Sequence, residues 1–359
     1  MSAFDFSEHS HRRWNPLTES WVLVSPHRAK RPWQGQEEKE SEEEKPSYLP
    51  DCYLCPGNKR AGGSQTNPQY ESTFVFDNDF PAVKVDQPAT IDQPEASNPL
   101  SHLLKTESVR GVCKVICFSP KHNITMAEMT SEEILRVVEE WVRQYRELGS
   151  LEYVNYVQIF ENKGSVMGCS NPHPHGQIWA TSDIPEEPTK EHRSFSSYHR
   201  THHSCLLCDY TTLELSLTTR LIHTTPHFIA LVPYWAVWPY EVMILPRRHV
   251  KTVEELEEGE RKDFADVLRI VTCKMDGVFE CGFPYSMGVH QAPTNHEGRE
   301  EWEGHLHVHF YPPLLRSRSV KKFLVGYEMM ASPQRDLTPE QAAERLRACL
   351  DVHYKKRGQ

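Results

Sequence analysis

The sequence lacks three features that assign many chains to a class at once: a long basic run, a leader-like N-terminus and an uninterrupted apolar stretch. Its 359 residues carry a formal net charge of −10, and the sequence pI is about 6.1. This balance argues against a nucleic-acid partner, because a polyanion attracts clustered Lys and Arg. Two short basic clusters, residues 28–31 and 315–322, suit a small anionic ligand better. Residues 1–6 carry no basic segment followed by an apolar run, so we expect no signal peptide.

The longest apolar stretch, residues 228–245, is interrupted by Pro233, Pro239 and Glu241. Its β-branched and aromatic residues suit two buried strands better than a membrane helix. We therefore expect a soluble, cytoplasmic protein with no membrane partner. In that compartment the ten cysteines are expected to be free thiols and metal ligands before disulfides.

What the sequence does contain is a distinctive stretch at residues 168–179. His173 and His175 lie two residues apart with a proline between them, and a helix interior disfavours proline. We expect a short or edge strand here, in which His173, His175 and Gln177 share one face. A polar loop that can turn its N–H groups toward phosphate oxygens is expected from Asn162, Gly164, Gly168, Ser170 and Asn171. The alternative is a purely structural histidine pair on a sheet edge.

The chain repeats one plan of strands, a helix and further strands. A Cys-x-x-Cys at Cys52 and Cys55 returns at Cys205 and Cys208. The length suits about two domains, and we expect a duplicated α+β fold with mainly antiparallel sheet, divided into residues 1–195 and 196–359. Strands are expected at residues 21–25, 73–80, 112–118, 153–160, 228–232 and 242–245, and capping boxes at 130–133 and 338–341. Residues 36–45 are expected to be a solvated insert.

Cys52 and Cys55 form one half of a zinc site. His122 and His173 are the candidates for the other half, which would give a closed tetrahedral Cys2His2 site. Zinc bound to His173 would hold the loop that carries His175 rigid. The alternative is two thiols in a turn without a metal.

His175 would then be free to act as a nucleophile. A neutral imidazole that attacks phosphorus gives a phosphoramidate, which divides one displacement into two easier ones. A main-chain carbonyl or a carboxylate on its other ring nitrogen would fix the tautomer. Gln177 can donate a hydrogen bond to a phosphoryl oxygen, but it cannot protonate a leaving oxygen. This suits a good leaving group such as a sugar phosphate, and favours covalent nucleotidyl transfer over hydrolysis.

A second histidine cluster lies near the C-terminus, and it leaves two interpretations open. By analogy with the first Cys-x-x-Cys, a second zinc site would consist of Cys205, Cys208, His249 and His307. Alternatively, His290, His307 and His309 join a carboxylate around a metal, with His305 on the same strand face. Both sets use His307, so we expect only one of them to be filled.

Several long motifs, in order, resemble the galactose-1-phosphate uridylyltransferase family, a branch of the histidine-triad superfamily. The resemblance runs nearly from end to end and rests on residues 12–18 (RRWNPLT), 25–35 (SPHRAKRPWQG), 160–164 (FENKG), 168–175 (GCSNPHPH), 283–288 (FPYSMG), 311–316 (YPPLLR), 322–328 (KFLVGYE) and 336–345 (DLTPEQAAER).

The resemblance implies a ping-pong reaction. UDP-glucose would uridylylate His175 and release glucose-1-phosphate, and galactose-1-phosphate would then take the uridylyl group to give UDP-galactose. Uridine contacts are implied for Phe76, Asn78 and Asp79, and phosphoryl contacts for Asn162, Gly168, Ser170 and Gln177. The sugar-phosphate side would be served by Arg28, Arg31, Lys322, Val325, Tyr327, Glu328 and Gln334. Members of the family are homodimers that build each site from both subunits.

The resemblance also implies zinc at Cys52, Cys55, His122 and His173. It implies a second metal, iron or zinc, at Glu191, His290, His307 and His309, and so favours the carboxylate set.

Three features depart from the family pattern. Gln291 follows His290 where the family has Gly. The loop at residues 294–304 is about two residues longer than the family loop, and Cys205 and Cys208 form an additional Cys-x-x-Cys. Adenylyl transfer on a sugar phosphate is the nearest alternative chemistry. A nucleotide hydrolase would require a third histidine at Gln177. A zinc scaffold without turnover would not require His175 and Gln177 beside the expected zinc ligand His173.

Overall fold

The computed structural model describes residues 4–30, 46–88, 98–295 and 301–357. The expected solvated insert at 36–45 and the candidate residue Arg31 lie outside this part of the chain, as do residues 296–300 of the segment 294–304.

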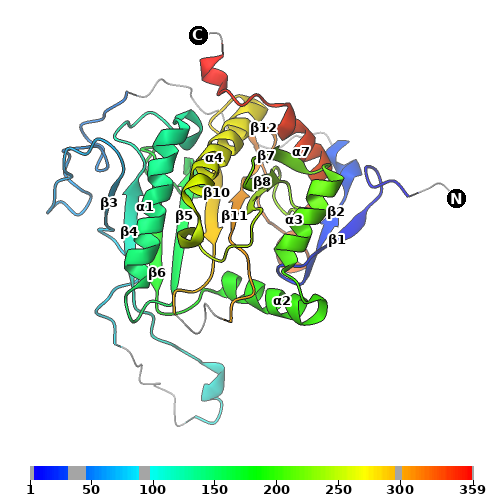
Figure 1. The fold of residues 1–359 in the computed structure, drawn as a ribbon, viewed down its shortest axis with the longest axis horizontal. Helices are drawn as coiled ribbons and strands as arrows, with labels where there is room; N and C mark the ends of the chain where they lie inside the picture. The colour runs from blue at the N-terminus through cyan, green and yellow to red at the C-terminus, as the bar shows by residue number, and fades with distance from the viewer. Residues whose placement is uncertain (1–3, 31–45, 89–97, 296–300, 358–359) are drawn as a thin grey trace.

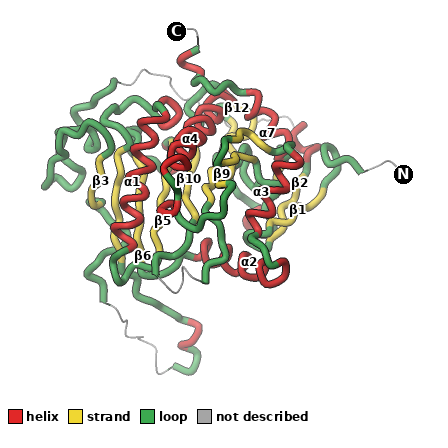
Figure 2. The backbone as a smooth tube through the Cα atoms, in the orientation of Figure 1, coloured by secondary structure: helices red, strands yellow, loops and turns green. Residues whose placement is uncertain are grey.

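A nine-stranded sheet forms the centre of the molecule, and all neighbouring strands in it are antiparallel (Figures 1 and 2). In spatial order it consists of β3 (Phe74–Asp77), β4 (Gly111–Cys117), β6 (His175–Thr181), β5 (Tyr156–Lys163), β10 (Tyr285–His290), β11 (His307–Tyr311), β9 (Val242–Pro246), β8 (Phe228–Leu231) and β7 (Leu221–Thr224). The expected α+β fold with mainly antiparallel sheet is confirmed.

The order of the strands shows the expected duplication. In the first half β4, β6 and β5 lie side by side, and in the second half β9, β11 and β10 repeat that arrangement. The equivalent strands β5 and β10 pair at the centre, with Ile159 opposite Val289 and Asn162 opposite Ser286. The two halves therefore share one continuous sheet, and a residue of one half can reach the site of the other.

Two long helices, α1 (Ser131–Gly149) and α4 (Glu258–Phe279), lie side by side over one face of this sheet (Figure 1). The Thr130 side chain accepts a hydrogen bond from the Glu133 N–H in the predicted capping box. Trp141 of α1 packs against Phe264 of α4, and both are fully buried. The apolar stripes of the two helices and the inner face of the sheet make one hydrophobic core.

The opposite face is covered differently in the two halves. Over β8 and β9 it packs against α2 (Glu186–His202) and α3 (Leu206–Leu217), which contribute Phe195 and Leu207 to a second core. Along β6, Ile178 is buried against α1 while His175 and Gln177 alternate onto this other, partly open face. This alternation leaves polar side chains partly exposed on this face in the first half of the sheet.

The remaining elements attach the chain ends to the second half. β14 (Gln334–Arg335) pairs in parallel with β2 (Ser20–Val24), β2 pairs with β1 (His11–Asn15), and β12 (Leu314–Ser317) pairs with β13 (Val320–Lys321). Two further helices are α6 (Tyr327–Met330) and α7 (Pro339–Ala348), and α7 carries the predicted capping box at Thr338 and Gln341. Within the described residues, no helix has both the length and the apolar character needed to span a membrane.

Candidate functional site

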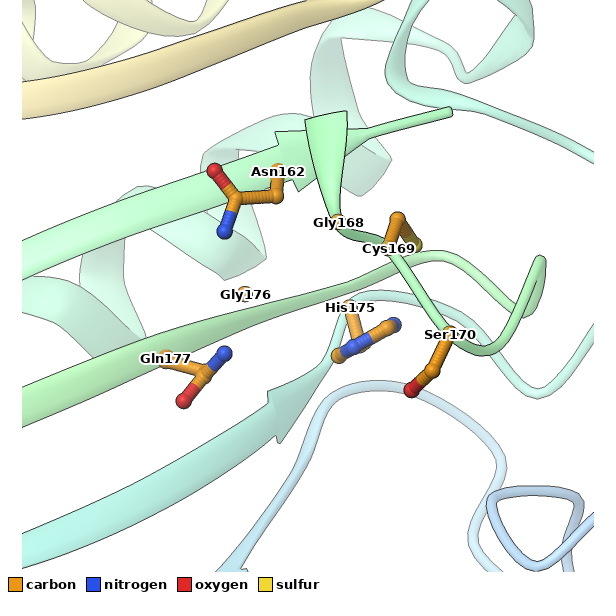
Figure 3. A pocket seen from close by; sticks show the side chains of 7 residues that line it. All are labelled: Asn162, Gly168, Cys169, Ser170, His175, Gly176 and Gln177. Atoms are coloured by element: carbon orange, nitrogen blue, oxygen red, sulfur yellow. The ribbon is translucent and has the colours of Figure 1, made fainter. Parts of the chain in front are cut away.

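A small polar pocket lies where β6 begins. Figure 3 shows the seven residues that line it, which are Asn162, Gly168, Cys169, Ser170, His175, Gly176 and Gln177. Its volume of about 40 Å³ corresponds to about three water molecules. A phosphoryl group suits this space, and the rest of a nucleotide would have to lie outside it.

His175 is held in one tautomer by the backbone. Its Nδ1 lies 2.7 Å from the main-chain oxygen of His173, and a carbonyl oxygen can only accept, so Nδ1 carries the proton. Burial lowers the pKa of His175, which keeps the ring neutral at neutral pH. Nε2 is therefore left with a lone pair at the pocket.

Two amides at the pocket are oriented by neighbouring side chains. Trp179 Nε1 donates to Gln177 Oε1 at 3.1 Å, and Ser286 Oγ donates to Asn162 Oδ1 at 2.7 Å. Because each amide oxygen is engaged, each NH2 group can donate to a ligand. Both amide nitrogens point toward the space around Gly176 in Figure 3.

Two glycines shape the pocket. Gly168 has a φ of 79°, in the left-handed region where a side chain would be strained. A Cβ on Gly176 would lie 2.9 Å from the Phe118 ring and from the Phe160 carbonyl oxygen. These positions therefore let the loop turn over the pocket and let β6 pack closely on the core.

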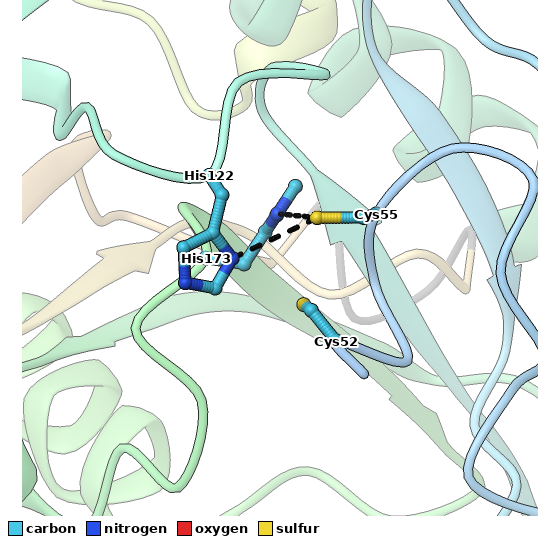
Figure 4. Close-up of side chains that lie close together, drawn as sticks. All are labelled: Cys52, Cys55, His122 and His173. Carbon is cyan, nitrogen blue, oxygen red and sulfur yellow. Dashed lines mark hydrogen bonds between the residues drawn. The ribbon is translucent and has the colours of Figure 1, made fainter. Parts of the chain in front are cut away.

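The predicted Cys2His2 set assembles beside this pocket. Cys55 Sγ lies 3.7 Å from His122 Nδ1 and 3.6 Å from His173 Nδ1 (Figure 4), and one ligand atom of each of these residues and of Cys52 falls within 4.8 Å of the others. In a tetrahedral zinc site, S–Zn and N–Zn bonds of the usual lengths place sulfur and nitrogen about 3.5 Å apart. Burial raises the pKa of Cys55 to about 11 and lowers that of His173 to about 4. A cation would offset both penalties, so these residues fit zinc.

This cluster is tied to the loop over the pocket. Asn171 Nδ2 donates to Cys52 Sγ at 3.4 Å, and Asn171 Oδ1 accepts from the His173 N–H at 3.0 Å. His173 Nε2 lies 2.9 Å from the Ser119 carbonyl oxygen and 3.1 Å from the Tyr70 hydroxyl. The backbone that positions His175 is therefore braced on both sides.

A second buried cluster surrounds Glu191 of α2. Its carboxylate lies 2.9 Å from His290 Nδ1, 3.5 Å from His307 Nε2 and 3.4 Å from His309 Nε2. Burial opposes its ionisation, but His290 and His307 hold the pKa of Glu191 well below its usual value. The contacts of His307 Nε2 and His309 Nε2 with this carboxylate do not have hydrogen-bond geometry, and neither atom has a hydrogen-bond partner among the described residues. Three imidazoles and one carboxylate in this arrangement fit Zn²⁺ or Fe²⁺.

The structure corrects one sequence-based alternative. His307 does not belong with Cys205, Cys208 and His249, because its Nδ1 lies 2.8 Å from the His305 carbonyl oxygen and its Nε2 faces Glu191. It is His305 that lies with the two cysteines, its Nδ1 3.3 Å from Cys208 Sγ. The two sets share no residue, so the expectation that they compete for His307 is wrong.

Phe76, one of the three residues expected to contact uridine, lies on the same side of the sheet as Gln177. Phe76 is opposite Val115, and Val115 is opposite Gln177, so all three point to one face. The Arg60 guanidinium lies 4.3 Å from the centre of the Phe76 ring and 2.5 Å from Asp79 Oδ1. Asn78 Oδ1 accepts from the Phe80 N–H at 2.9 Å.

The residues expected on the sugar-phosphate side gather elsewhere. Lys322 is paired with Glu328 and lies 3.5 Å from Gln334 Oε1, and Arg28 Nε lies 3.6 Å from Asp336 Oδ1. Val325 and Tyr327 are exposed. This group lies beside β2, β12 and β14, and Figure 1 shows β2 and β12 on the opposite side of the molecule from β6. The single chain does not bring the group to the His175 pocket.

Several residues that shape the site received no role in the sequence interpretation. Trp179, Ser286, Tyr70, Ser119 and Arg60 orient or brace the candidate residues through the contacts above. The spacing within β6 places Trp179 on the same face as Gln177, so the contact between these two side chains could have been predicted from the sequence. The contact of Ser286 depends on the pairing of β5 with β10, which no local pattern encodes.

Comparison with known proteins places the chain in a family. The N-terminal domain of galactose-1-phosphate uridyl transferase matches residues 2–185, and the C-terminal domain matches residues 191–358. A galactose-1-phosphate uridylyltransferase of Haemophilus influenzae is 56% identical over 354 residues, covering 99% of this chain and 98% of the relative. The protein of the same description from Saccharomyces cerevisiae is 50% identical over 362 residues, with coverage of 99% and 98%.

Solved structures agree with this assignment. A uridylyltransferase structure is similar with a TM-score of 0.72 at 27% identity, covering 95% of this chain and 98% of that chain. An ADP-glucose phosphorylase from Arabidopsis thaliana with bound ADP-glucose has the same fold, with a TM-score of 0.73, 20% identity and coverage of 95% and 100%. From the two domain matches and the relatives that are about half identical over the whole length, the chain belongs to the galactose-1-phosphate uridylyltransferase family.

Proposed function

We propose that this chain is a transferase of galactose metabolism that exchanges UMP between UDP-glucose and galactose-1-phosphate through a covalent uridylyl group on His175. Family membership supports the reaction. The observation that carries the mechanism is the His175 imidazole, fixed by the His173 carbonyl with Nε2 at a pocket lined by amide donors.

In the first half-reaction, His175 Nε2 attacks the phosphorus that bears uridine. The new P–N bond forms as the P–O bond to the second phosphate breaks, and glucose-1-phosphate leaves. In the second half-reaction, a phosphate oxygen of galactose-1-phosphate attacks the same phosphorus. The P–N bond breaks, UDP-galactose forms, and His175 returns to its neutral state.

The amides of Gln177 and Asn162 stabilise charge on the phosphoryl oxygens during both steps. Their NH2 groups are oriented in advance by Trp179 and Ser286, so little reorganisation is needed as charge develops. A sugar phosphate leaves as a stable anion without needing a proton, which is why an amide suffices where a hydrolase would use a third imidazole.

Metals support this chemistry from outside the pocket. We propose structural zinc at Cys52, Cys55, His122 and His173, and a second zinc or iron ion at Glu191, His290, His307 and His309. Bound zinc supplies rigidity, because it fixes His173, whose carbonyl holds the His175 tautomer. We also propose that the chain consists of two units, residues 1–195 and 196–359. The two family domains, which match residues 2–185 and 191–358, support a division into two units.

We also propose that the enzyme is a cytoplasmic homodimer. The segment that follows β13 exposes several apolar side chains, including Tyr327 at 59% and Met330 at 85% exposure. It also carries five of the sugar-phosphate candidates, namely Lys322, Val325, Tyr327, Glu328 and Gln334. Figure 1 shows β2, which pairs with β14 at Gln334, far from β6 of the same chain. A second copy that covers this segment with its own His175 pocket would receive Lys322 and Gln334 of this chain there.

An exchange experiment tests the covalent pathway. The protein is incubated with UDP-glucose and labelled glucose-1-phosphate in the absence of galactose-1-phosphate. Label should appear in UDP-glucose, because a uridylyl-enzyme can return its group to glucose-1-phosphate. Absence of exchange, with UDP-galactose still formed when both substrates are present, would contradict the ping-pong pathway. Exchange with ADP-glucose and not UDP-glucose would place the protein with adenylyl transferases.

A further inference from the structure

We infer that Cys205, Cys208, His249 and His305 bind a third metal ion, a tetrahedral Zn²⁺, separate from the two metals proposed above. The four residues come from the start of α3, the loop after β9 and the residues before β11. One ligand atom from each lies within 4.8 Å of the others.

The distances within this set are those of a zinc site. Cys208 Sγ lies 3.5 Å from His249 Nδ1 and 3.3 Å from His305 Nδ1, and Cys205 Sγ lies 3.9 Å from His305 Nδ1. Tetrahedral zinc with ordinary bond lengths separates its sulfur and nitrogen ligands by about 3.5 Å. A cation can therefore bind here without rearrangement of the backbone.

The set repeats the geometry of the Cys52 cluster in the other half of the molecule. Both use Cys-x-x-Cys, and both present Nδ1 of each histidine to sulfur. The ring centres of His249 and His305 are 5.2 Å apart with planes at 76°, against 5.5 Å and 62° for His122 and His173. Equivalent positions of the duplicated fold supply the ligands, since His173 and His305 each lie two residues before the strands β6 and β11.

The new site does not compete with the Glu191 cluster. His305 directs Nδ1 toward the cysteines, while its carbonyl oxygen lies 2.8 Å from His307 Nδ1. His307 then presents Nε2 to Glu191. His305 therefore belongs to the third site and His307 to the Glu191 cluster, so both sites can be filled in the same molecule.

The start of α3 stabilises negative charge on sulfur. Cys205 is the N-cap of α3 and Cys208 lies in its first turn, where the helix dipole stabilises negative charge. Zinc held there would connect α3 to the loop after β9 and to the start of β11. Its consequence is structural: it fixes the chain immediately before His307.

Metal analysis of matched variants tests the inference. The purified protein and the Cys208→Ser variant are compared by elemental analysis, with Cys349→Ser as the control. Cys349 is also half-buried, but its Sγ contacts only the Arg345 carbonyl oxygen, at 3.3 Å, among the hydrogen bonds described. Cys208→Ser should lose one zinc ion per chain and Cys349→Ser none. Equal zinc content in all three proteins would overturn the inference.

A second pair of measurements remains informative if Cys208→Ser folds poorly. His249 is exposed, so His249→Gln perturbs the fold least and should also lower zinc content by one ion per chain. After reconstitution with Co²⁺, thiolate-to-cobalt absorption should fall by about half in this variant, because two Cys2His2 sites become one. Unchanged absorption, or a Cys205–Cys208 disulfide found by mass in the purified protein, would contradict the site.

The outcome is independent of the proposed reaction. His249→Gln keeps the His175 pocket, so UDP-glucose should still exchange with glucose-1-phosphate. Loss of zinc with retained exchange supports the third site. Retained zinc would reject that site and leave the uridylyl transfer mechanism unaffected.

Discussion

The two halves of the molecule use the same structural unit for different purposes. In each, a backbone carbonyl lies at hydrogen-bond distance from Nδ1 of the histidine two residues later, at 2.7 Å for His175 and 2.8 Å for His307. His175 presents Nε2 to a small polar pocket. His307 presents Nε2 to Glu191 and is 1% exposed. We propose that His175 acts as a nucleophile and His307 as a metal ligand because the two imidazoles, fixed in the same way, face different groups.

The covering elements explain this divergence. In the second half α2 places Glu191 over the strands and contributes Phe195 to a buried core. In the first half the equivalent face carries Gln177, whose amide faces a pocket. Two positions after the equivalent histidines, the second half has His309 and the first has Gln177. We propose that this one difference separates a set of metal ligands from a phosphoryl-binding site.

The largest expected difference concerns the two equivalent histidines. His175→Ala should abolish uridylyl transfer, lowering kcat/KM by at least about 10⁴-fold, because the nucleophile is lost. His307→Ala should instead lose a metal ion and thermal stability while still forming the uridylyl adduct. Steady-state kinetics with metal analysis compares them. Substantial turnover by His175→Ala would break the proposed division of roles.

The next largest effect on catalysis is expected at Gln177, whose amide occupies the position that the His309 imidazole has in the second half. Gln177→Ala should lower kcat by about 10²–10³-fold, since one donor to the phosphoryl oxygens is lost. Trp179→Phe keeps the amide and removes the N–H that orients it, so a smaller decrease in kcat with little change in KM is expected. If Trp179→Phe altered only KM, its positioning role would be wrong.

An ion cluster that anchors the chain ends to the second half has no described counterpart in the first. Glu340 binds Arg13 at 2.8 Å and Arg220 at 2.9 Å. Burial opposes ionisation of Glu340, but the arginines lower its pKa from 4.5 to about 2.

Because the folded-state pKa is lowered, this stabilisation is present above the unfolded pKa and is lost as the pH falls toward about 2. Glu340→Gln should therefore lower the free energy of unfolding at pH 7 by about 3 kcal/mol. The difference from wild type should shrink between pH 5 and pH 3 in urea titrations. A difference that is constant over this range would exclude ionisation of Glu340 as the cause.

The smallest expected difference is in the rate at which the two Cys2His2 sets release zinc. Cys52 and Cys55 are buried, whereas Cys205 and Cys208 are half-buried and His249 is exposed. His173 Nε2 lies beside Ser119 and Tyr70, while His305 Nε2 has no hydrogen-bond partner among the described residues. A chelator should therefore remove zinc from the second set about tenfold faster or more. Tyr70→Phe should reduce the difference between the two zinc-release rates. Equal release rates from both sets in the unmodified protein would contradict the expected difference in stability.

Much of the fold and of the candidate site could be predicted from the sequence, because the residues that specify these features lie close together in the chain. The capping boxes at Thr130 and Thr338, the strand at His175 and the Cys52 ligand set all follow from spacing, and the structure forms each of them. His305 and His307 lie two positions apart, so spacing gives both the same face and does not assign them to different sites. Their division depends on which ring nitrogen the backbone carbonyl occupies and on where α2 places Glu191.

The most direct test of the central claim is the location of the covalent group. The protein is incubated with UDP-glucose alone, weighed intact, and digested under conditions that preserve phosphoramidates. We predict a gain of one uridylyl group per chain, found on His175, while the equivalent His307 stays unmodified. A uridylyl group on any other residue, or no adduct under conditions of full turnover, would contradict the assignment of His175 as the nucleophile.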